Sequence, residues 1–201
     1  MKTLLLASAN RGKIREFASL LRDVRVLGLA DLGITDLDEP HDTFIENAIA
    51  KAREASRRSG LAALADDSGL RVDALGGAPG VYSARFSGVH GDDAANRRLL
   101  LAKLEGVPPE ARGARFCCVL ALADVAGPLG GAAVTAEGVA EGEIALEPSG
   151  EGGFGYDPLF VPRGHRESYA SLDASVKHAI SHRARAVAAM LPMLQRYLTL
   201  G

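Results

Sequence analysis

The stretch Ala65-Asp66-Asp67-Ser68-Gly69-Leu70 decides how the chain is interpreted, because it places two adjacent carboxylates directly after an apolar run. That run, Leu61-Ala-Ala-Leu-Ala65, is typical of a buried strand. Two carboxylates beside a buried strand are costly unless a cation or a proton offsets their charge. A bound divalent metal, a general base, or both would explain them. The alternative is a solvated turn of common turn formers, and the backbone is expected to turn here in either case.

Composition excludes several classes of protein. A chain of 201 residues is long enough for one domain, or one core with two lobes. The net charge of −2 argues against nucleic-acid and anionic-membrane partners. No apolar run is long enough to span a bilayer, and the N-terminal one is too short for a signal peptide. Cys117 and Cys118 are adjacent in a strand-like run, as expected for small hydrophobes in a reducing compartment. We therefore expect a cytoplasmic protein.

The first segment predicts a strand, a small polar loop and a helix. Leu4–Ala7 is apolar, Ser8-Ala-Asn-Arg-Gly-Lys13 is polar, and apolar residues then recur at helical spacing. Such a connection presents backbone N–H groups to phosphate. Lys13 would oppose the helix dipole, which a bound phosphate would offset. The spacing of a Walker loop is absent, so an ordinary connection with a solvated lysine stays open as the alternative.

The next segment predicts a strand, an acidic connector and a capped helix. The strand is Val24–Leu27, and the acidic connector from Asp31 to Glu39 is by default a solvated loop. Thr43 and Glu46 have the spacing of a capping box that opens a helix ending near Arg58. Its packed side is expected to hold Phe44, Ala48, Ala52 and Ala55. Its solvent face is expected to hold Lys51, Arg53, Arg57 and Arg58.

The middle of the chain alternates strands, glycine-rich loops and one helix. The elements expected there are a strand 70–75, a long loop 76–88, a helix 92–104, a strand 115–123 with a hairpin to 132–139, and a short strand 159–161. Within the glycine-rich segment 150–158, Phe154-Gly155-Tyr156-Asp157 combines aromatic faces with a carboxylate. Glycines allow close approach of a planar ligand, and an aromatic ring can stack on a base. Alternatively, Phe154 and Tyr156 fill the core.

A C-terminal helix is expected from about Ala174, kinked or restarted at Pro192. The residues expected to point inward are Val176, Ile180, Val187, Leu191, Leu194 and Leu198. His178 and His182 could share a helix face, but a zinc site lacks the HExxH pattern and a third ligand. The hydrogen-bond donors suited to an oxygen-rich ligand are Lys177, His182 and Arg183. A solvated basic face is the alternative.

Six motifs, in order from residue 8 to residue 183, resemble the inosine/xanthosine triphosphate pyrophosphatase family. They are Ser8-x-Asn10-x-x-Lys13-x-x-Glu16, Thr43-Phe-Ile-Glu-Asn-Ala48, Ala65-Asp-Asp-Ser-Gly-Leu70, Gly76-Gly-Ala-Pro-Gly-Val-Tyr-Ser-Ala-Arg85, Gly152-Gly-Phe-Gly-Tyr-Asp-Pro158 and Ser181-His-Arg183. One departure is Ser8-Ala9, where members often carry Thr-Gly. Ser8 keeps the hydroxyl, but the loss of glycine bears on close backbone approach at position 9.

The resemblance implies an elongated α/β fold with two lobes around a long mixed β-sheet and an active-site cleft between the lobes. It implies that residues 1–201 form a single catalytic domain, assembled as a homodimer. The implied reaction is Mg²⁺-dependent hydrolysis of a non-standard purine nucleoside triphosphate, such as ITP, dITP, XTP or dXTP, to the monophosphate and pyrophosphate.

The resemblance also implies roles for matching positions. Asp67 corresponds to the general base and metal contact, with Asp66 beside it and Ser68 touching substrate. The triphosphate would be held by Ser8, Ala9, Asn10, Arg11, Gly12 and Lys13. The base and sugar would be held by Phe154, Gly155, Tyr156, Asp157, Lys177, His182 and Arg183. The second metal ligand would be Asp38 or Glu39, and the alignment leaves both open.

The chemistry of the substrate agrees with these roles. Attack of water at the α-phosphorus needs the triphosphate charge neutralised and a base near the water, which a metal-carboxylate group with Lys13 and an Asp would provide. Hypoxanthine and xanthine present O6 as an acceptor, whereas adenine presents a donor that the donor cluster would oppose. Two rival hypotheses are a pyrophosphatase for modified pyrimidine or standard triphosphates and a nucleotide-binding regulator without turnover.

Overall fold

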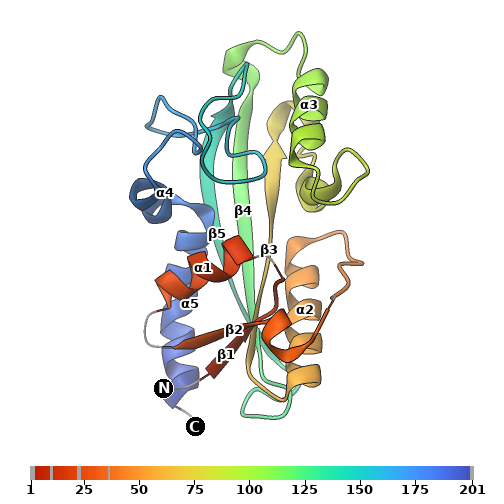
Figure 1. Ribbon diagram of the computed structural model, residues 1–201, viewed down its shortest axis with the longest axis vertical. Helices are drawn as coiled ribbons and strands as arrows, with labels where there is room; N and C mark the ends of the chain where they lie inside the picture. The colour runs from red at the N-terminus through yellow and green to blue at the C-terminus, as the bar shows by residue number, and fades with distance from the viewer. Residues whose placement is uncertain (1–2, 10, 22–23, 36, 200–201) are drawn as a thin grey trace. The chain divides into compact units, whose positions relative to one another are not determined.

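The computed structural model describes residues 3–9, 11–21, 24–35 and 37–199 and has an α/β fold (Figure 1). Six strands form one mixed sheet in the order β2-β1-β3-β4-β5-β6. The strands are β1 (Thr3–Leu6), β2 (Arg25–Gly28), β3 (Ala63–Val72), β4 (Gly113–Ala123), β5 (Ala133–Ile144) and β6 (Phe160–Pro162). The α-helices are α1 (Arg11–Leu20), α2 (Phe44–Ser59), α3 (Asp93–Lys103), α4 (Ala174–Ile180) and α5 (His182–Thr199). Strand β1 runs parallel to both β2 and β3, and β6 runs antiparallel to β5, which confirms the predicted α/β class with a mixed sheet.

The chain divides into two compact units. Unit 1 comprises Met1–Asp67, Cys118–Gly138 and Ala184–Gly201, and unit 2 comprises Ser68–Cys117 and Val139–Arg183. The boundary therefore falls inside β3, between Asp67 and Ser68.

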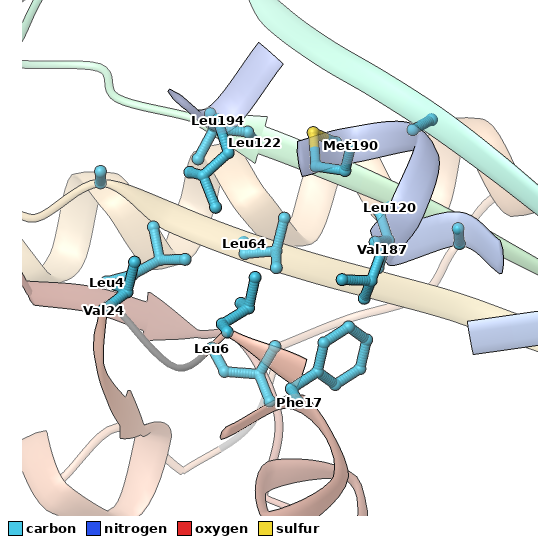
Figure 2. Packing of buried hydrophobic residues seen from close by; sticks show 14 of the residues in the cluster. Leu4, Leu6, Phe17, Val24, Leu64, Leu120, Leu122, Val187, Met190 and Leu194 are labelled. Atoms are coloured by element: carbon cyan, nitrogen blue, oxygen red, sulfur yellow. The ribbon is translucent and has the colours of Figure 1, made fainter. Parts of the chain in front are cut away.

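The core of unit 1 lies on both faces of its strands, because successive side chains of a strand point to opposite sides. On one face, leucines of β1, β3 and β4 pack against Phe17 of α1 and against Val187, Met190 and Leu194 of α5 (Figure 2). On the other face, alanines of β3 and β4 pack against Ala48, Ala52 and Ala55 of α2. Small side chains on both partners allow α2 to lie close to the strands. The packed side of α2 is thus as predicted.

The core of unit 2 is built around aromatic side chains. Phe116 of β4 meets Phe160 of β6 edge-on, with 4.7 Å between the ring centroids, and Phe160 lies 5.0 Å from Tyr169. Leu100 and Leu104, from the end of α3, complete this cluster and are fully buried. The helix predicted over residues 92–104 is confirmed, with Asp92 accepting from the backbone N–H of Ala95 as its N-cap.

The turn predicted at Asp66–Gly69 is wrong. Strand β3 continues through these residues to Val72, and the chain bends only at residues 73–75. The residue types favour a turn when Asp and Ser side chains bond to the local backbone. Here the two aspartates instead meet partners from distant segments, so the local preference is overridden.

The single C-terminal helix predicted from Ala174 is also wrong. Helix α4 ends at Ile180, Ser181 has extended backbone angles (φ −67°, ψ 154°), and α5 begins at His182. Pro192 lies inside α5 instead of starting a new helix. His178 and His182 consequently do not share a helix face, and Val176, predicted to point inward, is 36% exposed. Among the helices of the described residues, none is long and apolar enough to cross a bilayer.

Candidate active site

Asp66 and Asp67 are both buried, at 1% and 6% exposure, although both are acidic. The Asp66 carboxylate pairs with Lys13 Nζ at 2.8 Å. The Asp67 carboxylate accepts a hydrogen bond from Asn47 Nδ2 at 3.1 Å and lies 3.7 Å from Lys51 Nζ. Each aspartate therefore has an ammonium group beside it, which offsets part of the cost of burying two adjacent charges.

Lys13 comes from the helix that follows the first loop. It lies in the first turn of α1, as the sequence predicts. The position opposes the helix dipole, and the salt bridge to Asp66 offsets part of that cost.

Lys51 corrects the prediction of a solvated face on α2. Its side chain is 7% exposed, and Nζ contacts Glu39 Oε1 at 2.5 Å and the backbone oxygen of Asp66 at 2.6 Å. Burial by itself lowers the pKa of this ammonium. The carboxylates of Asp66, Asp67 and Glu39 raise it by more, so the pKa of Lys51 lies above its usual value. Lys51 is thus a buried permanent cation at the centre of three carboxylates. Its spacing from Ala48, Ala52 and Ala55 on the packed face could have indicated this.

Asn47 is a second residue that the sequence interpretation missed. It is 1% exposed and lies one turn before Lys51 on α2. Its Oδ1 accepts from the backbone N–H of His41 at 2.9 Å, and its Nδ2 donates to the His41 oxygen at 3.0 Å. Because the same Nδ2 also donates to Asp67, the amide ties the backbone at His41, just before α2, to this carboxylate.

The electrostatics favour a base at position 67. Burial raises the pKa of Asp67 to about 6; the nearby charges of Glu39 and Asp66 raise it too, while Lys51 and Asn47 lower it. A carboxylate with that pKa is ionised at neutral pH yet more basic than an ordinary aspartate, which suits proton abstraction.

The same residues fit a magnesium ion only in part. Their donor atoms are carboxylate oxygens, which Mg²⁺ prefers. Of the two connector acids, Glu39 shares Lys51 with Asp67, whereas Asp38 is exposed. Among the residues that the structure describes, however, no group of three or more His, Cys, Asp or Glu side chains is arranged to hold a metal by itself. Mg²⁺ commonly completes its coordination with water and substrate phosphates, which is the arrangement that this donor set allows.

The described residues of the first loop differ in exposure. Ser8 is half-buried, and its backbone carbonyl oxygen accepts a hydrogen bond from the backbone N–H of Leu29 at 3.3 Å. Ala9 is exposed, Gly12 is half-buried in α1, and Arg11 begins α1. Asn10 lies outside the described residues.

A second group of predicted site residues gathers in unit 2 around Phe154. This ring is 36% exposed, so it does not fill the core. Lys177 Nζ lies 5.3 Å from its centroid, and the Arg183 guanidinium carbon lies 5.0 Å from it. Asp157 is buried and accepts from Lys177 Nζ at 2.6 Å and from the Phe154 backbone N–H at 2.8 Å. A half-exposed ring beside two cations is suited to stacking with an electron-rich base.

Tyr156 does fill the core, as the alternative interpretation predicted for it. It is 4% exposed, and its hydroxyl donates to the Ser83 oxygen at 2.9 Å. Burial, with a smaller contribution from Asp93, raises the pKa of this hydroxyl, so it stays protonated. Tyr156 therefore anchors the loop to the core.

The remaining predicted donors, Arg183 and His182, are both buried but have different neighbours. Arg183 Nη2 donates to Ser68 Oγ at 3.2 Å, which brings those two predicted residues together. His182 is 3% exposed and stacks on Phe116, with 4.8 Å between the ring centroids. His182 is thus part of the aromatic core, while Lys177 and Arg183 lie beside Phe154.

The sequence profile described as the Ham1 family matches residues 4–193. The chain belongs to the Ham1 family. A dITP/XTP pyrophosphatase of Desulforamulus reducens is 49% identical to this Ham1 protein, over 96% of each chain. The solved structure of a HAM1 protein from Coxiella burnetii has a TM-score of 0.88 and 42% identity, and the match covers 98% of this chain and 100% of that one.

A further solved structure, from Mycobacterium abscessus, is titled nucleoside-triphosphatase / dITP/XTP pyrophosphatase. It is 48% identical, has a TM-score of 0.76, and the match covers 94% of this Ham1 chain and 99% of that chain.

Proposed function

We propose that this Ham1 protein hydrolyses non-standard purine nucleoside triphosphates, ITP and dITP or XTP and dXTP, to the monophosphate and pyrophosphate. The observation that carries the proposal is the buried Asp66–Asp67 pair, in which each carboxylate faces a lysine. A protein that only bound nucleotides would gain little from two buried carboxylates at a phosphate site. The similarity to dITP/XTP pyrophosphatases along nearly the full chain supports the same reaction class.

Asp67 acts as the general base. Above its pKa of about 6 the carboxylate is ionised and accepts a proton from the water that attacks the α-phosphorus. The bond from the α-phosphorus to the bridging oxygen breaks, and pyrophosphate leaves. Asn47 and Lys51 hold the Asp67 carboxylate in place.

The triphosphate is bound by Lys13 and the backbone of the first loop, Ser8 to Gly12. Lys13 lies beside Asp66 at the start of α1, where helix N–H groups attract an anion. A negatively charged triphosphate at this position adds an anionic partner for Lys13.

The protein is proposed to use Mg²⁺, with Asp67 and Glu39 as its protein ligands. Glu39 is favoured over Asp38 because it already shares Lys51 with Asp67. When bound, the ion neutralises charge on the triphosphate. Asp38, which is exposed, is the alternative to Glu39 as the second ligand.

The base stacks on Phe154, with Ser68, Lys177 and Arg183 as polar contacts. Donors aimed at O6 accept hypoxanthine and xanthine and reject adenine, since the adenine 6-amino group would leave donors facing donors. His182 stays in the core and holds the start of α5, from which Arg183 projects.

We also propose that residues 1–201 act as one catalytic domain in a cytoplasmic homodimer whose partner molecules are nucleotides alone. The resemblance of the sequence motifs supports the single domain and the homodimer, the two free cysteines suit a reducing compartment, and the net charge of −2 argues against nucleic-acid partners.

The test measures pyrophosphate released from inosine, xanthosine, guanosine and thymidine triphosphates by the purified protein with Mg²⁺. Clear preference for the inosine and xanthosine substrates is expected. Equal rates on guanosine or thymidine triphosphate would favour a pyrophosphatase for standard or modified pyrimidine nucleotides. Binding without turnover would favour a regulatory protein.

A further inference from the structure

Two side chains of α3 hold the loop that carries Phe154. Asp93 and Arg97 are four residues apart, so they lie on the same face of the helix. Asp93 Oδ2 accepts from the backbone N–H of Gly155 at 2.7 Å, and Arg97 Nη1 donates to the backbone oxygen of Gly155 at 2.6 Å. The two polar backbone groups of one residue are thus bound by two charged side chains.

The residue that they hold has an unusual backbone. Gly155 has φ +60°, a left-handed conformation that few residues other than glycine adopt. Charged partners make stronger hydrogen bonds to backbone groups than neutral partners do. The two contacts therefore stabilise a conformation that the isolated loop would populate only in part.

The held residue lies between the two aromatic residues of the loop. The Tyr156 hydroxyl donates a hydrogen bond to the Ser83 backbone oxygen, and the Phe154 backbone N–H donates one to the Asp157 carboxylate. The Phe154 ring itself is 36% exposed, and the described contacts of its ring are the cations of Lys177 and Arg183. Its position also depends on the backbone of residues 154–157, and Asp93 and Arg97 bind this backbone from α3 at Gly155.

We propose that Asp93 and Arg97 are positioning residues for base recognition, which act through the Gly155 backbone to pre-organise Phe154 for stacking. The proposal rests on the proposed function at this site. Pre-organisation lowers the conformational entropy lost on binding, so the pair affects the binding of the base and leaves the hydrolytic step unchanged.

The test compares Arg97→Met with Arg98→Met, since Arg98 is an exposed arginine on the same helix. Loss of one charge-assisted hydrogen bond is expected to raise the KM for inosine triphosphate about three- to tenfold in Arg97→Met, with kcat unchanged. Inhibition by inorganic tripolyphosphate, which has no base, is expected to stay the same. Arg97→Lys is expected to recover part of the loss, and Arg98→Met to behave like the wild type.

Hydrogen exchange gives a readout that does not depend on activity. Faster exchange in a peptide covering residues 152–157 of Arg97→Met, with no change elsewhere, would support the proposal. An unchanged KM, or equal weakening of tripolyphosphate and inosine triphosphate, would overturn it. Failure of the wild type to hydrolyse inosine triphosphate would instead overturn the proposed function, and the exchange result would still report on the loop.

Discussion

At the scale of single residues, two buried aspartates meet partners from distant segments: Lys13 of α1 pairs with Asp66, and Asn47 and Lys51 of α2 face Asp67. The sequence identified Asp66 and Asp67 as site residues, because two adjacent carboxylates after an apolar run require a cation or a proton to offset their charge. Lys51 and Asn47 were not identified, because a lysine on a helix is usually solvated and an asparagine has no distinctive pattern. Only the fold shows that both face Asp67 from α2. The spacing of Lys51 on the packed face of α2 indicates its burial, but no local pattern indicates which carboxylates it meets.

Asp67→Asn is expected to retain nucleotide binding and to lose most hydrolysis. Removal of a general base costs about 10²- to 10⁴-fold in rate. The measurement is single-turnover hydrolysis of inosine triphosphate beside equilibrium binding of the same nucleotide. Unchanged turnover would remove Asp67 from the role of base.

The same substitution is expected to stabilise the metal-free protein at neutral pH. The pKa of Asp67 is raised from 3.8 to about 6 in the folded state. Between these values the folded protein binds more protons than the unfolded chain, so Asp67 lowers stability as the pH rises from 4 to 6. Asn47 can still donate to an asparagine oxygen.

The free energy of unfolding of Asp67→Asn should therefore exceed that of the wild type by about 2 kcal/mol at pH 7.5 in EDTA, with little difference at pH 4. Denaturant titrations across this range give the comparison, because groups distant from position 67 titrate alike in both proteins. A difference that does not vary with pH would contradict the raised pKa.

Lys51→Met is expected to be strongly destabilising. It leaves Glu39 and Asp67 without their shared cation in a buried position, a change that typically costs about 3–5 kcal/mol. Arg57→Met is the matched control on α2, since Arg57 forms an exposed pair with Glu54 that contributes about 0–1 kcal/mol. Urea unfolding of both variants makes the comparison, and equal losses would show that Lys51 is not a buried partner of these acids.

At the scale of elements, most strands and helices could be predicted, and the errors share one cause. Periodicity located β1, β4, α2 and α3 because each has one clear buried face. It failed at β3 and at Ser181, where local preferences compete with tertiary contacts. Asp-Asp-Ser-Gly favours a turn in isolation, yet distant lysines and an asparagine hold it in a strand. The break between α4 and α5 falls at Ser181, where no proline or glycine indicates the end of a helix.

Thr43 at the start of α2 provides a test at this scale. Its hydroxyl oxygen accepts from the Glu46 backbone N–H at 3.3 Å and stabilises the helix that carries Asn47 and Lys51. Thr43→Ala is expected to lower stability by about 1 kcal/mol, and Thr43→Ser to retain it, as for other N-caps. Thermal unfolding distinguishes the two. Equal stability of the alanine and serine variants would show that this cap does not stabilise α2.

At the scale of the whole molecule, the proposed site residues divide between the two units. Those proposed to act on the triphosphate, Lys13, Glu39 and Asp67, belong to unit 1. Those proposed to bind the base, Phe154, Lys177 and Arg183 among them, belong to unit 2. The sequence predicted both groups through short motifs, but not that β3 passes from one unit to the other between Asp67 and Ser68.

This division predicts separable effects of substitution. Phe154→Ala is expected to raise the KM for inosine triphosphate about tenfold, by the loss of base stacking, and to leave inhibition by tripolyphosphate unchanged. Lys13→Met is expected to weaken both the binding of inosine triphosphate and the inhibition by tripolyphosphate, since it removes a cation from the phosphate site. Steady-state kinetics with and without tripolyphosphate make the comparison. If Phe154→Ala weakened inhibition by tripolyphosphate as much as Lys13→Met does, the division of roles would be contradicted.

In the proposed reaction, water attacks the α-phosphorus of a non-standard purine nucleoside triphosphate. Hydrolysis of inosine triphosphate in ¹⁸O-labelled water, followed by mass spectrometry of the products, locates the bond that breaks. Inosine monophosphate is expected to carry the label, and pyrophosphate is expected to remain unlabelled. Label in the pyrophosphate, or inosine diphosphate with labelled phosphate as the products, would contradict it.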